Sequence, residues 1–167
     1  NALQICCMKY LQLLFLIIAT SFTTSAQLVV QVYDGDTYKI FHQGKFQIIR
    51  LANVDAPELS QYYGRLVKNE VSKLILTKIV RIQVYGKDRY GRTVAKITVA
   101  GKSLDSLLIS YGWAWHWLEY SHNKTLSVYE RLAIEASNGM WKCKHNVPPW
   151  LWRKLNRKQK RLNEMCR

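Results

Sequence analysis

Three short strand-like runs near the start of the chain, separated by only a few residues, constrain its fold most strongly. They cover 28–33 (LVVQVY), 37–41 (TYKIF) and 46–51 (FQIIRL), and each is rich in β-branched and aromatic residues. The dipeptides Asp34-Gly35 and Gln43-Gly44 between them are typical of tight turns. Strands joined by so few residues pair antiparallel, because a parallel connection needs a crossover of a dozen or more residues. We therefore predict an antiparallel β meander.

The following segments complete a small β barrel with helices. Pro57 ends the meander, and Ser60 is the expected N-cap of a helix that reaches about Leu76. Hydrophobic periodicity predicts two further strands and two further helices, over 80–84, 93–99, 104–111 and 126–137. Five short strands with one helix between the third and the fourth match the oligonucleotide-binding (OB) plan. The predicted fold class is α+β with a mainly β core: a five-stranded OB-fold Greek-key barrel with three helices and a basic C-terminal extension.

The first 26 residues have the layout of a secretory signal peptide. Lys9 precedes an apolar run over 11–19, and small and polar residues follow up to Ala26. The run is shorter than the ~20 residues that a membrane-spanning helix needs. We expect cleavage after Ala26 and a secreted or periplasmic protein without stable membrane association; the alternative is a leader retained as an anchor. Residues 1–7, upstream of Met8, are interpreted as an over-extended translation start.

After the leader we predict one OB-fold domain over 27–142 and a basic tail over 143–167. The sequence carries 25 Lys+Arg against 11 Asp+Glu, a formal net charge of +14, which attracts polyanions such as nucleic acid or an anionic membrane. Leucines and Cys166 in the tail are spaced to share one helix face. Its lysines and arginines form either a solvated surface or extra phosphate contacts, and we favour the phosphate contacts.

The composition excludes two classes of protein and leaves one disulfide open. With 8 Gly, 3 Pro and 4 Cys, the chain is neither collagen-like nor a disulfide-dense scaffold. Cys143 and Cys166 remain after the expected cleavage. In an exported protein this pair is either a disulfide that closes the tail or two unpaired thiols, and the sequence favours neither.

Five charged residues lie where strands and turns alone do not require them. They are Asp36 after the first turn, Arg50 late in the third strand, Asp55 and Glu58 around the following bend, and Arg92 at the start of the fifth strand. Two carboxylates brought together repel each other unless a cation lies between them, and oxygen ligands suit a hard ion such as Ca²⁺. Two arginines hold a phosphate by bidentate, charge-assisted bonds. A cation, a phosphate clamp and a spare carboxylate are what metal-assisted phosphodiester hydrolysis requires.

The stretches around these residues resemble the thermonucleases, also called the micrococcal or staphylococcal nuclease family. The matching stretches occur in family order over about 28–142: Asp34-Gly35-Asp36-Thr37, Arg50-Leu51, Val54-Asp55-Ala56-Pro57-Glu58, Asp88-Arg89-Tyr90-Gly91-Arg92, Tyr111-Gly112-Trp113-Ala114 and Gly139-Met140-Trp141. The resemblance implies an endonuclease that cleaves DNA and RNA and leaves 3′-phosphate ends.

The resemblance also implies roles for the residues around the predicted cation. Asp36 and Asp55 would bind Ca²⁺, with the backbone carbonyl of Ala56 as a further ligand. Glu58 would orient or deprotonate the attacking water.

Other residues are implied in substrate binding. Arg50 and Arg92 would hold the scissile phosphate and stabilise the pentacoordinate transition state. Arg89, Tyr90 and Tyr120 match positions that line the nucleotide pocket. Leu118 departs from the family pattern, since members often carry a second tyrosine there.

Two alternatives accompany this hypothesis. A noncatalytic OB module that only binds nucleic acid would not need the five charged residues, so their joint presence favours the enzyme. Trp113, Trp115 and Trp117 alternate, which suits either a stacking platform for bases or a segment with one face in the core; we favour the core. We expect a monomer.

Overall fold

The computed structural model describes residues 27–163. The predicted leader and Cys166 lie outside this range. Within it, no helix is both long enough and apolar enough to cross a membrane.

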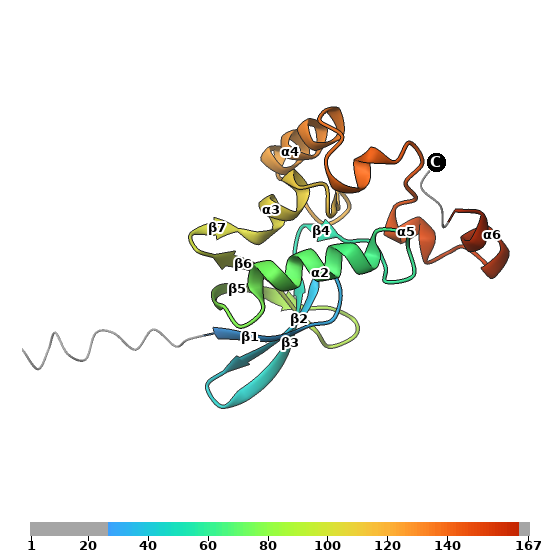
Figure 1. Cartoon of the computed structure of the whole chain (residues 1–167). Helices are drawn as coiled ribbons and strands as arrows, with labels where there is room; N and C mark the ends of the chain where they lie inside the picture. The colour runs from blue at the N-terminus through green and yellow to red at the C-terminus, as the bar shows by residue number, and fades with distance from the viewer. Residues whose placement is uncertain (1–26, 164–167) are drawn as a thin grey trace, which may run out of the picture.

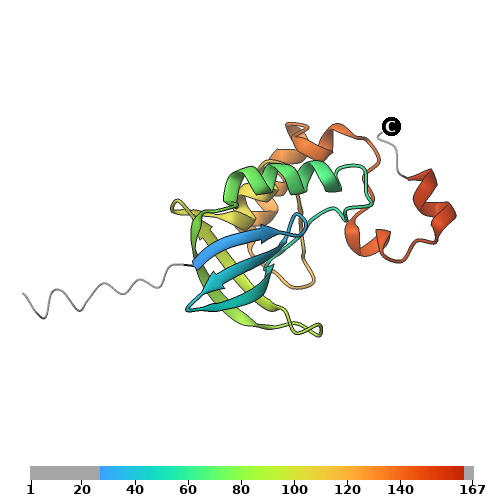
Figure 2. The same ribbon diagram turned by 60° about the horizontal axis from the view of Figure 1, so that its bottom comes forward.

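Five strands form the predicted barrel. They are β1 (Gln27–Val32), β2 (Thr37–His42), β3 (Lys45–Leu51), β5 (Ile79–Lys87) and β6 (Thr93–Val99). β1 pairs antiparallel with β2 and β5, β2 pairs with β3, and β5 pairs with β6. Parallel pairing of β3 with β6 closes the barrel, which Figure 2 shows from the side of its strands. The predicted OB-type architecture is confirmed.

The barrel interior is filled by the apolar residues of the strands. Because side chains alternate between the two faces of a strand, Tyr38 and Ile40 of β2 and every second residue from Ala95 to Val99 of β6 are buried. The helix α2 (Gly64–Ile75) adds residues of one helical face to the same core. Completely buried members are Val29, Tyr38, Ile40, Ile49, Val67, Val71, Ile75, Ala95 and Ile97. Each such aliphatic or aromatic side chain stabilises the fold by about 1.5–3 kcal/mol.

Helix α2 begins at Gly64, so the prediction of a start at Ser60 is wrong. The chain between Pro57 and the helix forms turns instead, in which Gln61 N–H donates to the Glu58 carbonyl and Gly64 N–H to the Gln61 carbonyl. A Cβ atom on Gly64 would lie 1.9 Å from the Glu58 carbonyl oxygen. Only glycine permits this close approach. The tight bend therefore fixes the backbone of Glu58 against the start of the helix.

Two further helices and three short strands complete the domain. Helix α3 (Leu104–Ser110) follows the short strand β7 (Lys102–Ser103), and helix α4 (Lys124–Glu135) is capped by Asn123. The strands β4 (Val54–Asp55) and β8 (Trp115–His116) pair with each other away from the main sheet. A 3₁₀ helix, η1 (Gly139–Lys142), ends the domain. In Figure 1 these helices and α2 lie beside the barrel, on one side of it.

The tail forms two short helices, α5 (Pro149–Trp152) and α6 (Arg157–Leu162), rather than one. Asn156 starts the second helix with a capping box. Its side-chain oxygen accepts the backbone N–H of Gln159, and the side-chain oxygen of Gln159 accepts the backbone N–H of Asn156. This break overturns the predicted leucine face, since Leu151 and Leu162 are exposed. Pro149 and Trp152 are the buried residues of α5. Cys143 is buried and disulfide-bonded.

His116 makes the stability of the domain sensitive to acid. Its ring is buried, with Nδ1 3.0 Å from Ser127 Oγ and Nε2 3.0 Å from Ser121 Oγ. Burial lowers the pKa of His116 below its ordinary value of 6.5, although Asp105 partly opposes the shift. The unfolded chain therefore binds the proton more readily, and the free energy of unfolding decreases as the pH falls below the ordinary histidine pKa.

We predict that His116→Gln weakens this acid sensitivity. The variant lacks the titrating ring, so its urea midpoint should fall less than that of the wild type between about pH 7 and about pH 5. Urea unfolding followed by circular dichroism measures both midpoints. Equal decreases in the two proteins would contradict the assignment.

Candidate active site

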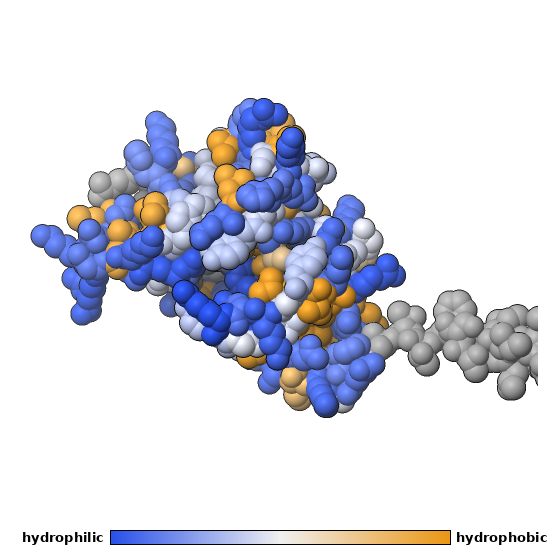
Figure 3. All heavy atoms as spheres, turned by 180° about the vertical axis from the view of Figure 1, so that it is seen from behind, coloured by the Kyte–Doolittle hydropathy of each residue, from blue (hydrophilic) through white to orange (hydrophobic). Residues whose placement is uncertain are grey.

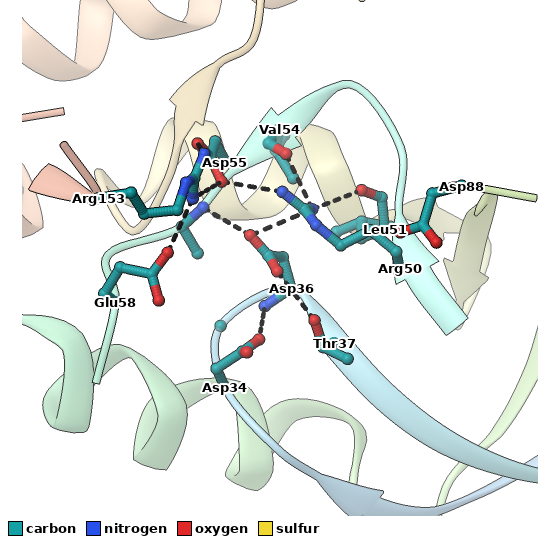
Figure 4. A network of polar contacts seen from close by, with 12 residues as sticks. Asp34, Asp36, Thr37, Arg50, Leu51, Val54, Asp55, Glu58, Asp88 and Arg153 are labelled. Atoms are coloured by element: carbon teal, nitrogen blue, oxygen red, sulfur yellow. Dashed lines mark hydrogen bonds and ion pairs between the residues drawn. The ribbon is translucent and has the colours of Figure 1, made fainter. Parts of the chain in front are cut away.

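Four of the five charged residues meet at one end of the barrel, where β2 begins and β3 leads into β4 (Figure 4). Asp36 immediately precedes β2, Arg50 is near the end of β3, and Asp55 lies in β4. The register pairs Thr37 with Arg50, which brings the start of β2 beside the end of β3. Glu58 follows in the bend before α2. The structure therefore brings together residues that are up to 22 positions apart, from Asp36 to Glu58.

Arg50 lies between the two aspartates. Its NH1 is 3.1 Å from Asp36 Oδ2 and its NH2 is 2.9 Å from Asp55 Oδ1. NH1 also donates to the backbone carbonyls of Leu51 (2.8 Å) and Val54 (3.0 Å). All three charged residues are buried, with exposed fractions of 7%, 5% and 1% for Arg50, Asp36 and Asp55. Such a guanidinium is held in one orientation before any substrate binds.

Asp36 is held by its neighbours on several sides. Its Oδ2 accepts the N–H of Ala56 at 2.7 Å, and its Oδ1 accepts the Thr37 hydroxyl at 3.2 Å. Its own N–H donates to Asp34 Oδ1, so Asp34 is the turn residue that its sequence context predicts. Burial raises the pKa of Asp36 to about 7, against the opposing effects of Arg50 and the Ala56 N–H. A bound cation would favour the ionised form of this carboxyl group.

Arg92 lies beside this cluster and contacts it through Thr37. Its Nε donates to Asp88 Oδ2 at 2.7 Å, and its NH1 donates to Thr37 Oγ1 at 3.4 Å. Thr37 in turn donates to Asp36. Asp88 also accepts the backbone N–H groups of Tyr90 and Arg92, so it shapes the turn that carries both residues. The predicted second arginine therefore borders the site and is partly exposed to solvent.

One exposed tyrosine ring contacts Arg89 and Arg92, and another packs against Trp117. Tyr90 is exposed, and the Cζ atoms of Arg89 and Arg92 lie 4.9 and 5.5 Å from its ring centroid. Tyr120 is also exposed and packs against Trp117 with 4.4 Å between ring centroids. Their exposure leaves both tyrosine rings accessible for stacking on bases, as the resemblance implies.

The alternating tryptophans divide between the core and the site. Trp115 is buried, and Trp113 packs against the hydrophobic core. The ring of Trp117, in contrast, lies 5.6 Å from Arg50 Cζ, within the range of a cation–π interaction. The core interpretation thus holds for two of the three. Trp117 lies beside the site, and the alternating spacing of the three tryptophans did not predict this position.

Arg153, at the end of α5, also reaches the site. Its NH2 is 2.8 Å from Asp55 Oδ2, and its NH1 is 2.7 Å from Glu58 Oε1 (Figure 4). Both carboxylates raise the pKa of the Arg153 guanidinium, although desolvation opposes them. In the sequence this residue is one of several basic residues of the tail. No local pattern distinguishes Arg153 from its basic neighbours.

The donor set suits a hard cation. Asp36 and Asp55 present carboxylate oxygens from two buried positions around the same guanidinium, and Glu58 stands at the open side with its side chain 37% exposed. No group of three or more His, Cys, Asp and Glu side chains in metal-binding arrangement occurs within 27–163. The predicted set has two carboxylates and the Ala56 carbonyl, and it is all oxygen, as Ca²⁺ prefers.

Comparison with known proteins identifies similar sequences. A model of the family described as "Staphylococcal nuclease homologue" matches residues 48–143. The chain is 35% identical over 126 residues to an "Uncharacterized endonuclease" of Escherichia coli, covering 75% of this chain and 82% of that protein. It is 35% identical over 127 residues to an "Uncharacterized endonuclease" of Haemophilus influenzae, covering 75% and 71%. A "Staphylococcal-like nuclease CAN1" of Arabidopsis thaliana is 35% identical over 113 residues, or 68% of this chain and 35% of the plant protein.

Proposed function

Because the chain belongs to the staphylococcal nuclease homologue family, we propose that it is a calcium-dependent endonuclease that hydrolyses phosphodiester bonds of DNA and RNA. One observation supports this function most strongly. Buried Arg50 is fixed between two buried aspartates, with Glu58 at the open edge of the same cluster. Burying three charges is costly for a domain that only binds nucleic acid, and surface arginines would serve that purpose.

The arginines act on the phosphate. Arg50 uses part of its donor capacity for the aspartates and backbone, and it would turn its remaining N–H groups toward a phosphate oxygen at the open side. Arg92 would approach the same phosphate from the neighbouring turn. Charge develops on the equatorial oxygens as phosphorus becomes pentacoordinate, so fixed guanidinium groups stabilise the transition state more than the substrate.

Glu58 acts on the water. It would accept a proton as the water oxygen attacks phosphorus and the bond from phosphorus to the 5′ oxygen breaks. The leaving 5′ oxygen ends as a hydroxyl with a proton from solvent, and the phosphate remains on the 3′ oxygen. The products therefore carry 3′-phosphate and 5′-hydroxyl ends.

Asp36 and Asp55, with the Ala56 carbonyl, would hold the calcium ion. When bound, this ion supplies positive charge beside the phosphate and lowers the pKa of bound water. The buried positions of the aspartates and the all-oxygen character of the set support this role.

Little sequence specificity is expected from this surface. Tyr90 and Tyr120 offer exposed ring faces, and every base has a face on which an aromatic ring can stack. The face of the molecule shown in Figure 3 is mostly hydrophilic, with hydrophobic residues gathered over the barrel.

We also propose that the protein is exported as a monomer after cleavage of its leader. N-terminal sequencing of the exported protein should give Gln27 or a residue close to it, whereas a retained leader would favour the anchored form.

Digestion of plasmid DNA and of RNA tests the proposed reaction. We expect both to be degraded in CaCl₂ and to stay intact in excess chelator. The DNA products should prime a polymerase only after phosphatase treatment, because a 3′-phosphate blocks extension. Intact nucleic acid in CaCl₂ would contradict the enzyme and favour the noncatalytic module. Products that prime without phosphatase would contradict the proposed cleavage position.

A further inference from the structure

The tail is docked against the loop that carries Glu58. Trp152 is buried, and its indole N–H donates to Ser60 Oγ at 2.9 Å. Gln61 also links the tail to this loop. Its side-chain N–H donates to the Val147 carbonyl at 2.7 Å, and its Oε1 accepts the Glu58 N–H at 2.8 Å. The hydrogen bonds from Trp152 to Ser60 and from Gln61 to Val147 hold α5 beside the bend before α2. The residue that follows α5, Arg153, is thereby directed at the site.

The guanidinium of Arg153 bridges two carboxylates with different expected roles. Its contacts at 2.8 Å with Asp55 and 2.7 Å with Glu58 are both charge-assisted hydrogen bonds. A longer contact of 3.3 Å joins its NH1 to Asp55 Oδ1. With Arg50 at Asp55 Oδ1, each oxygen of Asp55 has a guanidinium partner. A cation that binds Asp55 must therefore share or replace one of these partners.

We infer that Arg153 is a positioning residue of the active site that competes with the divalent cation for Asp55. The inference rests on the proposed function and deepens it, because it concerns the calcium affinity of the same site. Of the two arginines on Asp55, Arg153 is the one that can leave. Its side chain is 43% exposed, whereas that of Arg50 is 9% exposed and also bound to Asp36 and two carbonyls.

Two effects of Arg153 act in the same direction. Its hydrogen bonds occupy oxygens that the cation would use, and its positive charge repels a second cation nearby. An ion pair of this partial exposure is worth up to about fivefold in an equilibrium constant. Arg153 therefore raises the calcium concentration needed to fill the site while holding Asp55 and Glu58 in place until it is filled.

Calcium titration of thermal unfolding tests the inference without measuring activity. A cation that binds only the folded protein raises its melting temperature, and the rise grows with the logarithm of the ratio of calcium concentration to dissociation constant. We expect Arg153→Gln to bind calcium about fivefold more tightly than the wild type. The matched control is Lys154→Gln, which removes the same charge from the next residue. Lys154 is exposed and forms no ion pair within the described chain, so its variant should match the wild type.

A folding check accompanies the titration. Arg153→Gln leaves the Trp152 anchor intact, and its melting curve without calcium shows whether it is folded. If it is not, Arg153→Lys is titrated instead; it keeps the charge but loses the paired hydrogen bonds, and we expect about twofold tighter binding.

The outcomes separate this inference from the proposed function. Tighter calcium binding in the Arg153 variant, but not in the Lys154 variant, supports it. Unchanged or weaker binding in the Arg153 variant overturns it, while calcium binding by the wild type still stands. A wild-type protein that calcium neither stabilises nor activates overturns both the inference and the calcium-dependent function.

Discussion

Replacing Arg50 with lysine is expected to slow phosphodiester cleavage by about 10²–10³-fold, as removal of one fixed transition-state donor does. Lysine keeps the positive charge but has no planar fork, so it cannot bridge Asp36 and Asp55 and also present N–H groups to phosphate. The measurement is the single-turnover rate at saturating oligonucleotide and calcium. Because the loss occurs in the transition state, the rate constant should fall far more than the affinity for substrate.

A matched control separates catalysis from general charge effects. Arg81 lies on β5, is exposed and forms no ion pair within residues 27–163. Arg81→Lys should retain nearly the full rate. Since Arg50 is buried, the melting temperature of Arg50→Lys is measured as well, and the rates are compared well below it. A folded Arg50→Lys protein with wild-type activity would show that Arg50 serves the fold and not the reaction.

Replacing Glu58 with glutamine is expected to slow cleavage by about 10²–10⁴-fold, the usual contribution of a general base. The amide has the same shape and still accepts a hydrogen bond from Arg153, but it does not accept the proton of the attacking water. The partly exposed position of Glu58 means that the fold should be retained. The rate constant should fall, with little change in the Michaelis constant.

Glu119→Gln serves as the control for Glu58→Gln. Glu119 is exposed, lies in the loop after β8, and forms no ion pair with the charged cluster within residues 27–163. Its variant should cleave at the wild-type rate. Comparable rates for Glu58→Gln and Glu119→Gln would remove Glu58 from the reaction and leave water activation to another group.

Much of the site could be predicted because its residues are close in the sequence and its strands are regular. The turn at Gln43-Gly44 and the alternation of the second and third strands fix the register that pairs Thr37 with Arg50 and so places Asp36 beside Arg50. Charged residues at the ends of apolar strands are unusual, and here they are residues that the fold brings together in one cluster. The start of α2 was mispredicted because Ser60 resembles an N-cap, although its hydroxyl instead accepts a hydrogen bond from Trp152.

The contribution of the tail could not be predicted from the sequence. Arg153 and Glu58 are 95 positions apart, and their contact depends on where Trp152 is buried. Hydrophobic spacing favoured Leu151 and Leu162 as the apolar face, but the capping box at Asn156 breaks the helix and changes which residues face inward. Within the described part of the tail, Arg153 is thus the arginine that reaches the site, while Arg157 and Arg161 are exposed on α6.

The central claim is that the charged cluster at the barrel end performs calcium-dependent phosphodiester hydrolysis. The most direct test is the cleavage rate of a fluorescently labelled single-stranded oligonucleotide, followed in real time with the wild-type chain. The rate should be substantial in CaCl₂, fall to background on addition of chelator, and return when calcium is restored. An uncleaved oligonucleotide in CaCl₂, bound by a folded protein, would contradict the claim.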